Sequence, residues 1–439
     1  MASDQILALA LTPFGKPMRE KYFLFAKDYT NVNQGSFGGY SSPVRNAEPD
    51  RFIRYVVPDI LRRSRSLLAD FMRCPMDELV LCPNVTTATN TVLLNIRWED
   101  GDKIVYTSGV YGALAKTIEA VIEAQPSVIG VSGVKLQLDL PLVSEKIVAL
   151  FREAMQNEKL KCKQVGKGRV RLAVFDTIIS LPGLMIPFEE MVRVCREEGV
   201  FSMIDAAHGI GHIPLNLGKL DPDFFVTNCH KWLFIPRFVA AFYVPKRNQH
   251  MIRTTLTTSH GFRPPAARQV FDPMPSSGET NPMVKQFEYF GTIDNAPYCC
   301  IETALNFREK FCGGEDAIWT YCTDLAREAG RILVESLGTE TFGIPEEERV
   351  FFAHVRLPVK VGDDASAAHV SLSDVPAVTE WINRQFVETY LTYLSLLFYR
   401  GSWWARLSVA VYVDIEDCRY IAKVLKELSE RVQRGEYKH

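Results

Sequence analysis

The 439-residue chain lacks the features that mark membrane, secreted and nucleic-acid-binding proteins. No uninterrupted apolar run approaches about 20 residues, and the mean hydropathy is −0.03, so no membrane span is expected. The formal net charge of −2 gives no sign of a nucleic acid or another polyanion as a partner. The N-terminus has a short apolar stretch without a basic segment before it, which favours a docking arm over a signal peptide.

The cysteines form neither a metal-binding nor a disulfide pattern. All ten are scattered, without a Cys-x-x-Cys pair, and Cys299 and Cys300 are adjacent. We therefore expect no metal, reduced thiols and a cytoplasmic location. Internal repeats and low-complexity tracts are absent as well.

The apolar pattern predicts an α/β fold. The chain is long enough for more than one domain. Between about residues 66 and 245, short apolar stretches alternate with helical patterns, which predicts a mostly parallel sheet covered by helices. The buried-strand candidates in this part are residues 103–106, 127–131 and 171–175. A helix is expected after Pro297, through Phe311.

Lys231 is the most informative residue, because it lies between two apolar stretches. The second stretch, residues 239–244, begins about ten residues after the first ends, which is too close for a parallel crossover. The two strands should therefore be antiparallel, with Lys231 at their joint. A lysine in a loop is usually a solvated surface residue. Next to Trp232 at a strand end, however, it is a candidate Schiff-base nucleophile, since burial lowers the pKa of an amine.

Two further segments point to the same edge of the sheet. Residues 201–211 indicate a short buried strand that ends at Asp205, with His208 in the turn after it. An aspartate there either caps a helix or holds a pyridine nitrogen protonated, as pyridoxal phosphate (PLP) requires. Residues 79–90 indicate a strand that leads into a helix with Thr86 and Thr87 in its first turn. Such threonines cap helices, and they also bind phosphate.

With these three segments in this order, the chain resembles fold-type I PLP enzymes of the class V aminotransferase group over nearly all its length. Within that group it is most similar to isopenicillin N epimerase-like proteins, which include ergothioneine-pathway C–S lyases and loline-type Mannich cyclases. The segments that carry this similarity are residues 51–55, 83–87, 111–112, 228–232, 258–262 and 290–297.

The resemblance implies the fold-type I PLP-dependent transferase fold. Its large domain, here residues 51–296, has a mostly parallel seven-stranded sheet, and a smaller α/β C-terminal domain follows in residues 297–439. Residues 1–50 are expected to join the small domain. The resemblance also implies a homodimer with shared active sites, in which Thr292 reaches the phosphate bound by the partner subunit.

The resemblance assigns roles to single residues. Lys231 matches the lysine that forms the Schiff base with PLP and moves the Cα proton, and Asp205 matches the aspartate on the pyridine nitrogen. Tyr111 matches the aromatic residue that stacks on the ring, although a tyrosine after a strand is usually core packing. Lys231 and Tyr111 are thus the expected catalytic residues. The other expected cofactor contacts are Thr86, Thr87, Asn228, His230 and Thr292 around the phosphate, and Ser180 and His208 near the O3′ oxygen.

Three residues are expected to bind an amino acid substrate. Arg406 matches the arginine that clamps the α-carboxylate, a task that suits the forked guanidinium. It lies in a predicted strand whose alternation points Arg406 and Ser408 the same way. Arg54 is the next candidate. Gln34 replaces the histidine that epimerase-like proteins usually have, and a glutamine cannot transfer a proton.

The reaction is less well defined than the cofactor. The C–S lyases and desulfurases of this group are expected to use a cysteine, but Leu114 occupies the place where one is expected. What remains is shared chemistry: a Cα carbanion or quinonoid that leads to elimination, to reprotonation or to attack on an electrophile. The expected function is a lyase or cyclase acting on a specialised amino acid in secondary metabolism. An amino-acid epimerase is the alternative, and a non-catalytic scaffold is disfavoured by Lys231, Asp205 and Arg406 together.

Overall fold

The computed structural model describes residues 55–126, 129–255, 262, 278–288, 293–343, 345, 350–362 and 370–438. Nearly all of them belong to one compact unit, which comprises residues 61–273 and 278–439. The other unit comprises residues 1–60 and 274–277, and its described part, residues 55–60, includes the beginning of helix α4 (Val57–Met72). The predicted N-terminal arm lies outside the described residues.

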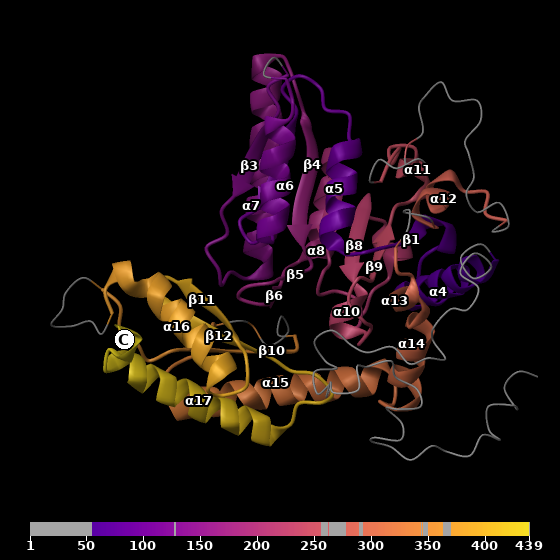
Figure 1. Ribbon diagram of the computed structural model, residues 1–439. Helices are drawn as coiled ribbons and strands as arrows, with labels where there is room; N and C mark the ends of the chain where they lie inside the picture. Colours follow the sequence, from indigo (N-terminus) through magenta and orange to yellow (C-terminus); the bar gives the residue numbers. More distant parts are fainter. Residues whose placement is uncertain are drawn as a thin grey trace, which may run out of the picture. The chain divides into compact units, whose positions relative to one another are not determined.

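A seven-stranded sheet in the order β1-β9-β8-β7-β4-β2-β3 forms the centre of the compact unit (Figure 1). Its strands are β1 (Leu79–Cys82), β2 (Lys103–Thr107), β3 (Ser132–Leu136), β4 (Val170–Asp176), β7 (Phe201–Asp205), β8 (Phe224–Asn228) and β9 (Ala240–Tyr243). Only β9 runs against the others, antiparallel to both β1 and β8. The predicted mostly parallel sheet and the antiparallel pair around Lys231 are confirmed.

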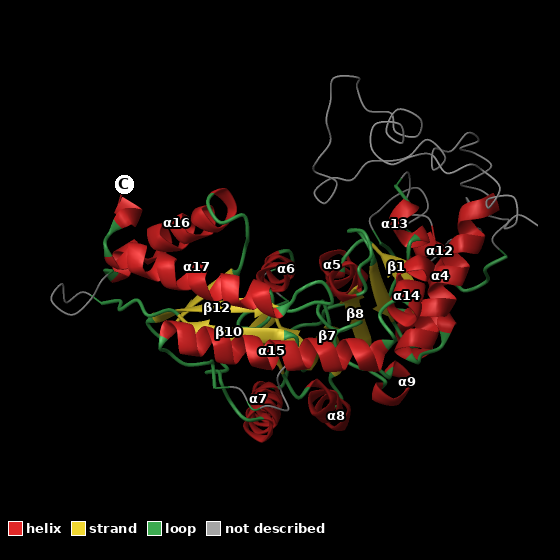
Figure 2. Ribbon diagram, turned by 90° about the horizontal axis from the view of Figure 1, so that it is seen from below, coloured by secondary structure: helices red, strands yellow, loops and turns green. Residues whose placement is uncertain are grey.

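Helices cover both faces of this sheet (Figure 2). One face carries α5 (Val85–Asn95) and α6 (Gly112–Glu123), and the other carries α7 (Ser144–Val165) and α8 (Phe188–Glu198). Apolar side chains from both strands and helices meet between the layers, as Val92, Ile104 and Met203 do without any exposure. Burial of each such side chain contributes about 1.5–3 kcal/mol, which fixes the strand ends that carry the site.

A second, three-stranded sheet is antiparallel throughout. It comprises β10 (Phe352–Arg356), β11 (Ser395–Tyr399) and β12 (Ser402–Ser408) in the order β10-β12-β11. Three long helices accompany it: α15 (Glu315–Leu337), α16 (Val375–Glu388) and α17 (Ile415–Gln433). A capping box of Asp414 and Asp417 begins α17. The division into a large domain up to residue 296 and a small domain after it stays a proposal.

The remaining elements are short connections. They are the strands β5 (Ile178–Ile179) and β6 (Leu184–Met185), the helices α9 (Leu217–Leu220), α10 (Cys229–Trp232), α11 (Lys246–Gln249), α12 (Pro282–Glu288), α13 (Ala296–Cys299) and α14 (Ile301–Lys310), and the 3₁₀ turns η3 (Met76–Glu78), η6 (Leu372–Asp374) and η7 (Glu436–Lys438). None of the helices in the described ranges is long and apolar enough to cross a membrane.

Two predictions of single elements were wrong in detail. The strand expected at residues 127–131 begins only at Ser132, and residues 127 and 128 lie outside the described ranges. Val131 packs into the core from the loop before β3, whereas β3 itself is a partly exposed edge strand with the mixed sequence Ser-Gly-Val-Lys-Leu. The apolar run therefore marked the approach to the strand. The helix expected after Pro297 is divided into α13 and α14 at Cys300.

Candidate active site

A cavity of about 610 Å³ lies where the carboxyl ends of β4, β7 and β8 face β12. Nine of the residues expected to bind cofactor or substrate line it. They are Thr86, Tyr111, Ser180, Asp205, His208, Asn228, His230, Lys231 and Arg406. Thr87 does not line it. The expected residues Gln34, Arg54 and Thr292 lie outside the described part of the chain.

Lys231 lies in the single helical turn α10, between the antiparallel strands β8 and β9. Its Nζ is 3.0 Å from Nε2 of His208. Burial lowers the pKa of Lys231 to about 8, although the nearby Asp205 carboxylate opposes this shift. About a tenth of the amine is therefore unprotonated at pH 7, far more than in an ordinary lysine, and the unprotonated form is the nucleophile.

Two buried carboxyl groups lie side by side at the ends of β7 and β4. Asp205 ends β7, and its Oδ1 accepts a hydrogen bond of 2.8 Å from the backbone N–H of Ala207. Asp176 is its register partner on β4, and each residue is 2% exposed. Burial raises the pKa of both carboxyl groups, and the charge of Asp205 raises that of Asp176 further. Within the described residues, Oδ2 of Asp176 has no hydrogen-bond partner.

The start of α5 forms another wall. Asn84 caps this helix, because its side chain accepts 2.8 Å and 3.0 Å hydrogen bonds from the backbone and hydroxyl of Thr87. Thr87 thus serves the cap, whereas Thr86 lines the cavity at the positive end of the helix. Asn228 joins this end to β8, since its Oδ1 accepts from the backbone N–H of Val85 at 3.1 Å. Such a helix start suits a phosphate group.

The aromatic residue and the expected cysteine position have different surroundings. Tyr111 precedes α6 and is 55% exposed at the cavity, so the core-packing interpretation is wrong for it. Leu114, one turn later, has no exposure and belongs to the hydrophobic core. A cysteine at position 114 would therefore point away from the cavity in this fold.

Arg406 enters the cavity from β12. Its guanidinium donates to the backbone carbonyl of Ser180 and, over 3.2 Å, to Oγ of Ser395, and it lies 4.5 Å over the ring of Phe352. No acidic residue in the described ranges pairs with it, and its buried Nε has no acceptor there. Burial lowers the pKa of Arg406 to about 10. Ser408 lines the same cavity, so the predicted alternation along the strand is confirmed.

The sequence did not single out several residues that the fold brings here. Asp176 directly follows the predicted strand at residues 171–175, a position that could have marked it. Asn84 lies in the predicted strand-to-helix turn. Phe234 and Tyr412 also line the cavity, with their ring centres 6.5 Å apart, but they carried no sequence signal.

The cavity fits PLP. Lys231 offers an amine of lowered pKa, Asp205 a buried carboxylate for a protonated pyridine nitrogen, and Thr86 a helix start for phosphate. The uncompensated charge of Arg406 and the unpartnered oxygen of Asp176 are groups that a charged, polar ligand would satisfy.

The fold and these side chains define an enzyme of the fold-type I PLP-dependent class. The chain belongs to the class V aminotransferase family: the family profile described as aminotransferase class-V matches residues 152–349. Over 96% of this chain and 97% of the relative, it is 35% identical to the L-cysteine desulfhydrase-like protein lolT1 of Epichloe uncinata. The chain is thus a PLP-dependent enzyme.

One other relative and one solved structure extend this comparison. Hercynylcysteine sulfoxide lyase of Schizosaccharomyces pombe is 28% identical, over 94% of this chain and 97% of the relative. A solved structure of a C-DES mutant, with glycine covalently linked to the PLP cofactor, has a TM-score of 0.67. It shares 16% identity and covers 88% of this chain and 89% of its own, which shows the fold.

Proposed function

We propose that this PLP-dependent enzyme is a lyase that removes the Cα proton of a specialised amino acid and expels a substituent from its side chain. The main support for this proposal is the Arg406 guanidinium, which lines the same cavity as Lys231 and lacks an acidic partner among the described residues. A buried cation of this kind suits the α-carboxylate of an amino acid, because two parallel N–H donors match two carboxylate oxygens.

The residues divide the chemistry among them. PLP, when bound, supplies a conjugated ring that accepts the negative charge developing at Cα. Lys231 would hold the cofactor through its Nζ, and the same amine, when free, would act as the general base for the Cα proton. Asp205 would keep the pyridine nitrogen protonated. Arg406 would orient the substrate through its carboxylate, and Tyr111 would contact the cofactor.

The cysteines support elimination over sulfur transfer to the enzyme. No cysteine in the described residues lines the cavity, although all ten lie within the described ranges. Cys82 and Cys229 are nearest along the chain to the site, and both are fully buried. Burial raises the pKa of the Cys229 thiol to about 12 and that of Cys82 further, so neither is a thiolate nucleophile. The names of the desulfhydrase-like and sulfoxide-lyase relatives support C–S cleavage.

A carbon–carbon bond-forming cyclase is the second candidate. It is favoured by the aromatic pair Phe234 and Tyr412 at the cavity, because aromatic faces stabilise a cationic electrophile such as an iminium. The volume of about 610 Å³ lies within the range of about 300–1,000 Å³ that is typical of small-molecule and cofactor sites.

A substrate panel with the purified enzyme tests these proposals. It pairs cysteine-sulfoxide conjugates with amino acids that carry a cyclic amine, and it follows pyruvate release, product mass and product chirality. Pyruvate released from the sulfur compounds supports the lyase. A cyclised product whose mass equals that of the substrate minus the leaving group supports the cyclase. An inverted Cα, with the Cα–H bond broken and re-formed and all other bonds of the substrate retained, would replace both with the epimerase.

We also propose a cytoplasmic homodimer with shared active sites. The free state of all ten cysteines supports a reducing compartment. The exposure of Tyr412, 78%, leaves a large aromatic surface beside the cavity, which suits cover by a second subunit. The interface should bury well over about 2,000 Å² in total. Sedimentation of a fully active monomer would overturn this proposal.

A further inference from the structure

Three side chains at the cavity form a series of hydrogen bonds that ends at the amine of Lys231. The indole Nε1 of Trp232 donates to Nδ1 of His208 over 3.2 Å. Nε2 of the same imidazole lies 3.0 Å from Nζ of Lys231. Trp232 is 7% exposed and His208 is 6% exposed, so water has little access to either bond.

The direction of the first bond decides the direction of the second. An indole N–H can only donate, so Nδ1 of His208 must be the nitrogen without a hydrogen. A neutral imidazole then carries its hydrogen on Nε2, and this N–H donates to Lys231. An ammonium group has three donors and no lone pair, so it cannot accept this bond. The bonded series is therefore complete only when Lys231 is a neutral amine.

The surroundings of His208 exclude the doubly protonated ring. Burial is the largest influence on the pKa of His208 and lowers it, and the charge of the Arg406 guanidinium lowers it further. An imidazolium would also direct a second N–H at the indole N–H, which no acceptor would satisfy. The neutral ring with its hydrogen on Nε2 is the form that agrees with both the lowered pKa of His208 and the hydrogen bond from the indole.

Charged groups face Lys231 from three strands. Burial is the largest influence on its pKa and lowers it. Asp205 on β7 and Asp176 on β4 favour the charged amine, whereas Arg406 on β12 disfavours it. The two carboxyl groups would thus draw a proton to Lys231 if the bond from His208 did not require its lone pair.

Packing prevents the indole from turning its N–H away. The ring of Trp232 lies 4.1 Å from that of His212 and 5.6 Å from those of Phe351 and Phe352, measured between centres. The backbone carbonyl of Trp232 accepts a hydrogen bond from the buried guanidinium of Arg308. Both ends of the residue are therefore fixed.

We propose that Trp232 is a positioning residue that favours the neutral amine of Lys231 by fixing His208 in the tautomer with its hydrogen on Nε2. This inference rests on the proposed role of Lys231 as the cofactor-binding lysine. It gives Trp232 a task that its aromatic packing alone does not explain, because the task depends on the indole N–H.

The test is the rate at which the full-length chain, stripped of cofactor, captures added PLP between about pH 6 and pH 10. Capture joins Nζ to the aldehyde carbon and releases one water, and only the unprotonated amine begins it, once it has given up the hydrogen bond from His208. In the unaltered protein the rate should rise with pH through about 8. In Trp232→Phe the midpoint should move up by at least about one pH unit, which lowers the rate at pH 7 about tenfold.

Nitrogen NMR of His208 in the stripped protein gives a second readout. It should show the hydrogen on Nε2 in the unaltered chain and a mixture of tautomers in Trp232→Phe. The matched control is Trp381→Phe on α16, whose indole lies 4.8 Å from the guanidinium of Arg431, outside the cavity lining. It should change neither readout.

If Trp232→Phe does not fold, the tryptophan analogue with sulfur in place of the indole N–H, placed at position 232, keeps the packing and removes only the donor. An unchanged pH profile in either variant, or the hydrogen found on Nδ1 in the unaltered chain, would overturn the inference. Peptide mapping of the captured cofactor separates this failure from that of the proposed function: label on a lysine other than Lys231 would refute the role of Lys231 itself.

Discussion

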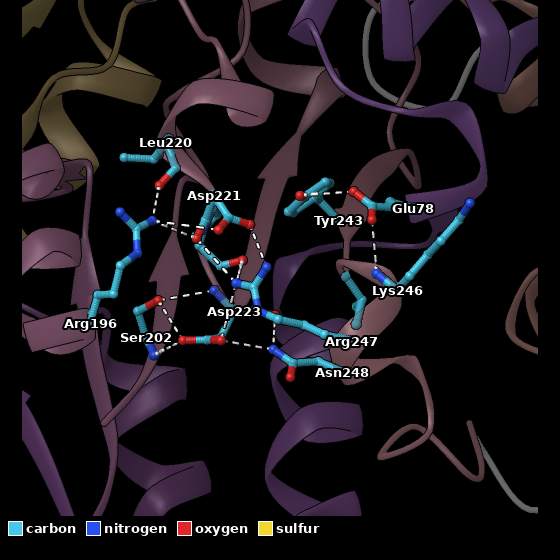
Figure 3. A network of polar contacts seen from close by, with 12 residues as sticks. Glu78, Arg196, Ser202, Leu220, Asp221, Asp223, Tyr243, Lys246, Arg247 and Asn248 are labelled. Carbon is cyan, nitrogen blue, oxygen red and sulfur yellow. Dashed lines mark hydrogen bonds and ion pairs between the residues drawn. The ribbon is translucent and has the colours of Figure 1, made fainter. Parts of the chain in front are cut away.

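Strands β7 and β8 carry polar residues at both ends, and the two ends are built in opposite ways. At the amino ends, the side chains satisfy one another (Figure 3). The Asp223 carboxylate accepts hydrogen bonds from the backbone N–H of Ser202 at 3.0 Å, from Asn248 at 2.8 Å and from Arg247 at 3.3 Å. Arg247 also pairs with Asp221. The charged side chains at the amino ends are therefore paired with one another.

At the carboxyl ends, the charged groups face a cavity. Lys231, Asp205 and Arg406 line the same space, and no ion pair of 4 Å or less joins any two of them. Asp176 retains a buried oxygen without a partner in the described residues. Buried polar groups left unpaired cost free energy, so their retention marks a site where a ligand completes the pairing. Paired charges at one end thus hold the strands, and the unpaired charges at the other end are the groups to which we assign the chemistry in our proposal.

Of the variants at the carboxyl ends of the strands, Lys231→Ala should have the largest effect on activity. Turnover should fall by at least about 10³-fold, because general acid–base transfer alone is worth about 10²–10⁴ and the covalent hold on the cofactor is lost as well. The variant should still bind PLP noncovalently. Steady-state rates and the absorbance spectrum measure both effects. Lys246→Ala is the control: this exposed lysine near the amino ends pairs with Asp77 at 2.6 Å, and its loss should leave turnover unchanged.

Arg406→Ala should abolish most substrate binding while it keeps the fold and the cofactor spectrum. Leaving a desolvated carboxylate unpaired costs about 2–5 kcal/mol, which weakens binding by about 30- to 4,000-fold. Arg406→Lys should recover part of the loss, since a point charge lacks the fork. Titration of the holoenzyme with amino acids measures it. Arg247→Ala is the comparison variant: it should lower stability and leave substrate binding intact. Normal binding in Arg406→Ala would assign the carboxylate to another arginine.

Gly183→Ala should weaken substrate binding by about tenfold through Arg406. Gly183 has φ +101°, and a β-carbon there would lie 2.7 Å from Cδ of Arg406. The Arg406 side chain would have to shift to relieve this contact. Displacing a group that positions the substrate lowers the affinity for that substrate. Gly199→Ala separates this effect from backbone strain, because Gly199 also has a positive φ, +65°, but no atom lies within 4 Å of its added carbon. Equal substrate affinities in the two variants would refute the contact.

Asp223→Ala should have the smallest effect on activity and a clear effect on stability. It leaves the partly buried N–H of Ser202 and the Asn248 amide without their acceptor, which costs about 1–3 kcal/mol of unfolding free energy. Denaturant unfolding measures this loss, and kcat at a temperature well below the midpoint should stay within about twofold. A fall in kcat as large as that of Lys231→Ala would end the distinction between the two strand ends.

The sequence predicted the positions of the main charged groups because strand ends can be read from apolar runs. Lys231 at an antiparallel joint and Asp205 at a strand end follow from one segment each. Arg406 beside Ser408 follows from strand alternation. The seven-stranded sheet came from the family resemblance, which supplied the topology that periodicity alone cannot give.

Contacts between distant segments could not be predicted in this way. Asp176 meets Asp205 only because β4 lies next to β7, and the strand order is a property of the whole sheet. The bond from Trp232 to His208 depends on how a turn folds back against α10. That Arg406 lacks an acidic partner in the described part of the chain depends on what faces it from other elements, which a single sequence does not reveal.

Borohydride reduction of the holoenzyme followed by peptide mapping tests the central claim, that Lys231 at the carboxyl end of β8 holds the cofactor covalently. Reduction should fix one pyridoxyl group per chain, and it should be found on the peptide that contains Lys231. The same treatment of Lys231→Ala should leave the chain unlabelled. A label on any other lysine, or an unlabelled chain that nevertheless turns over substrate, would contradict the claim.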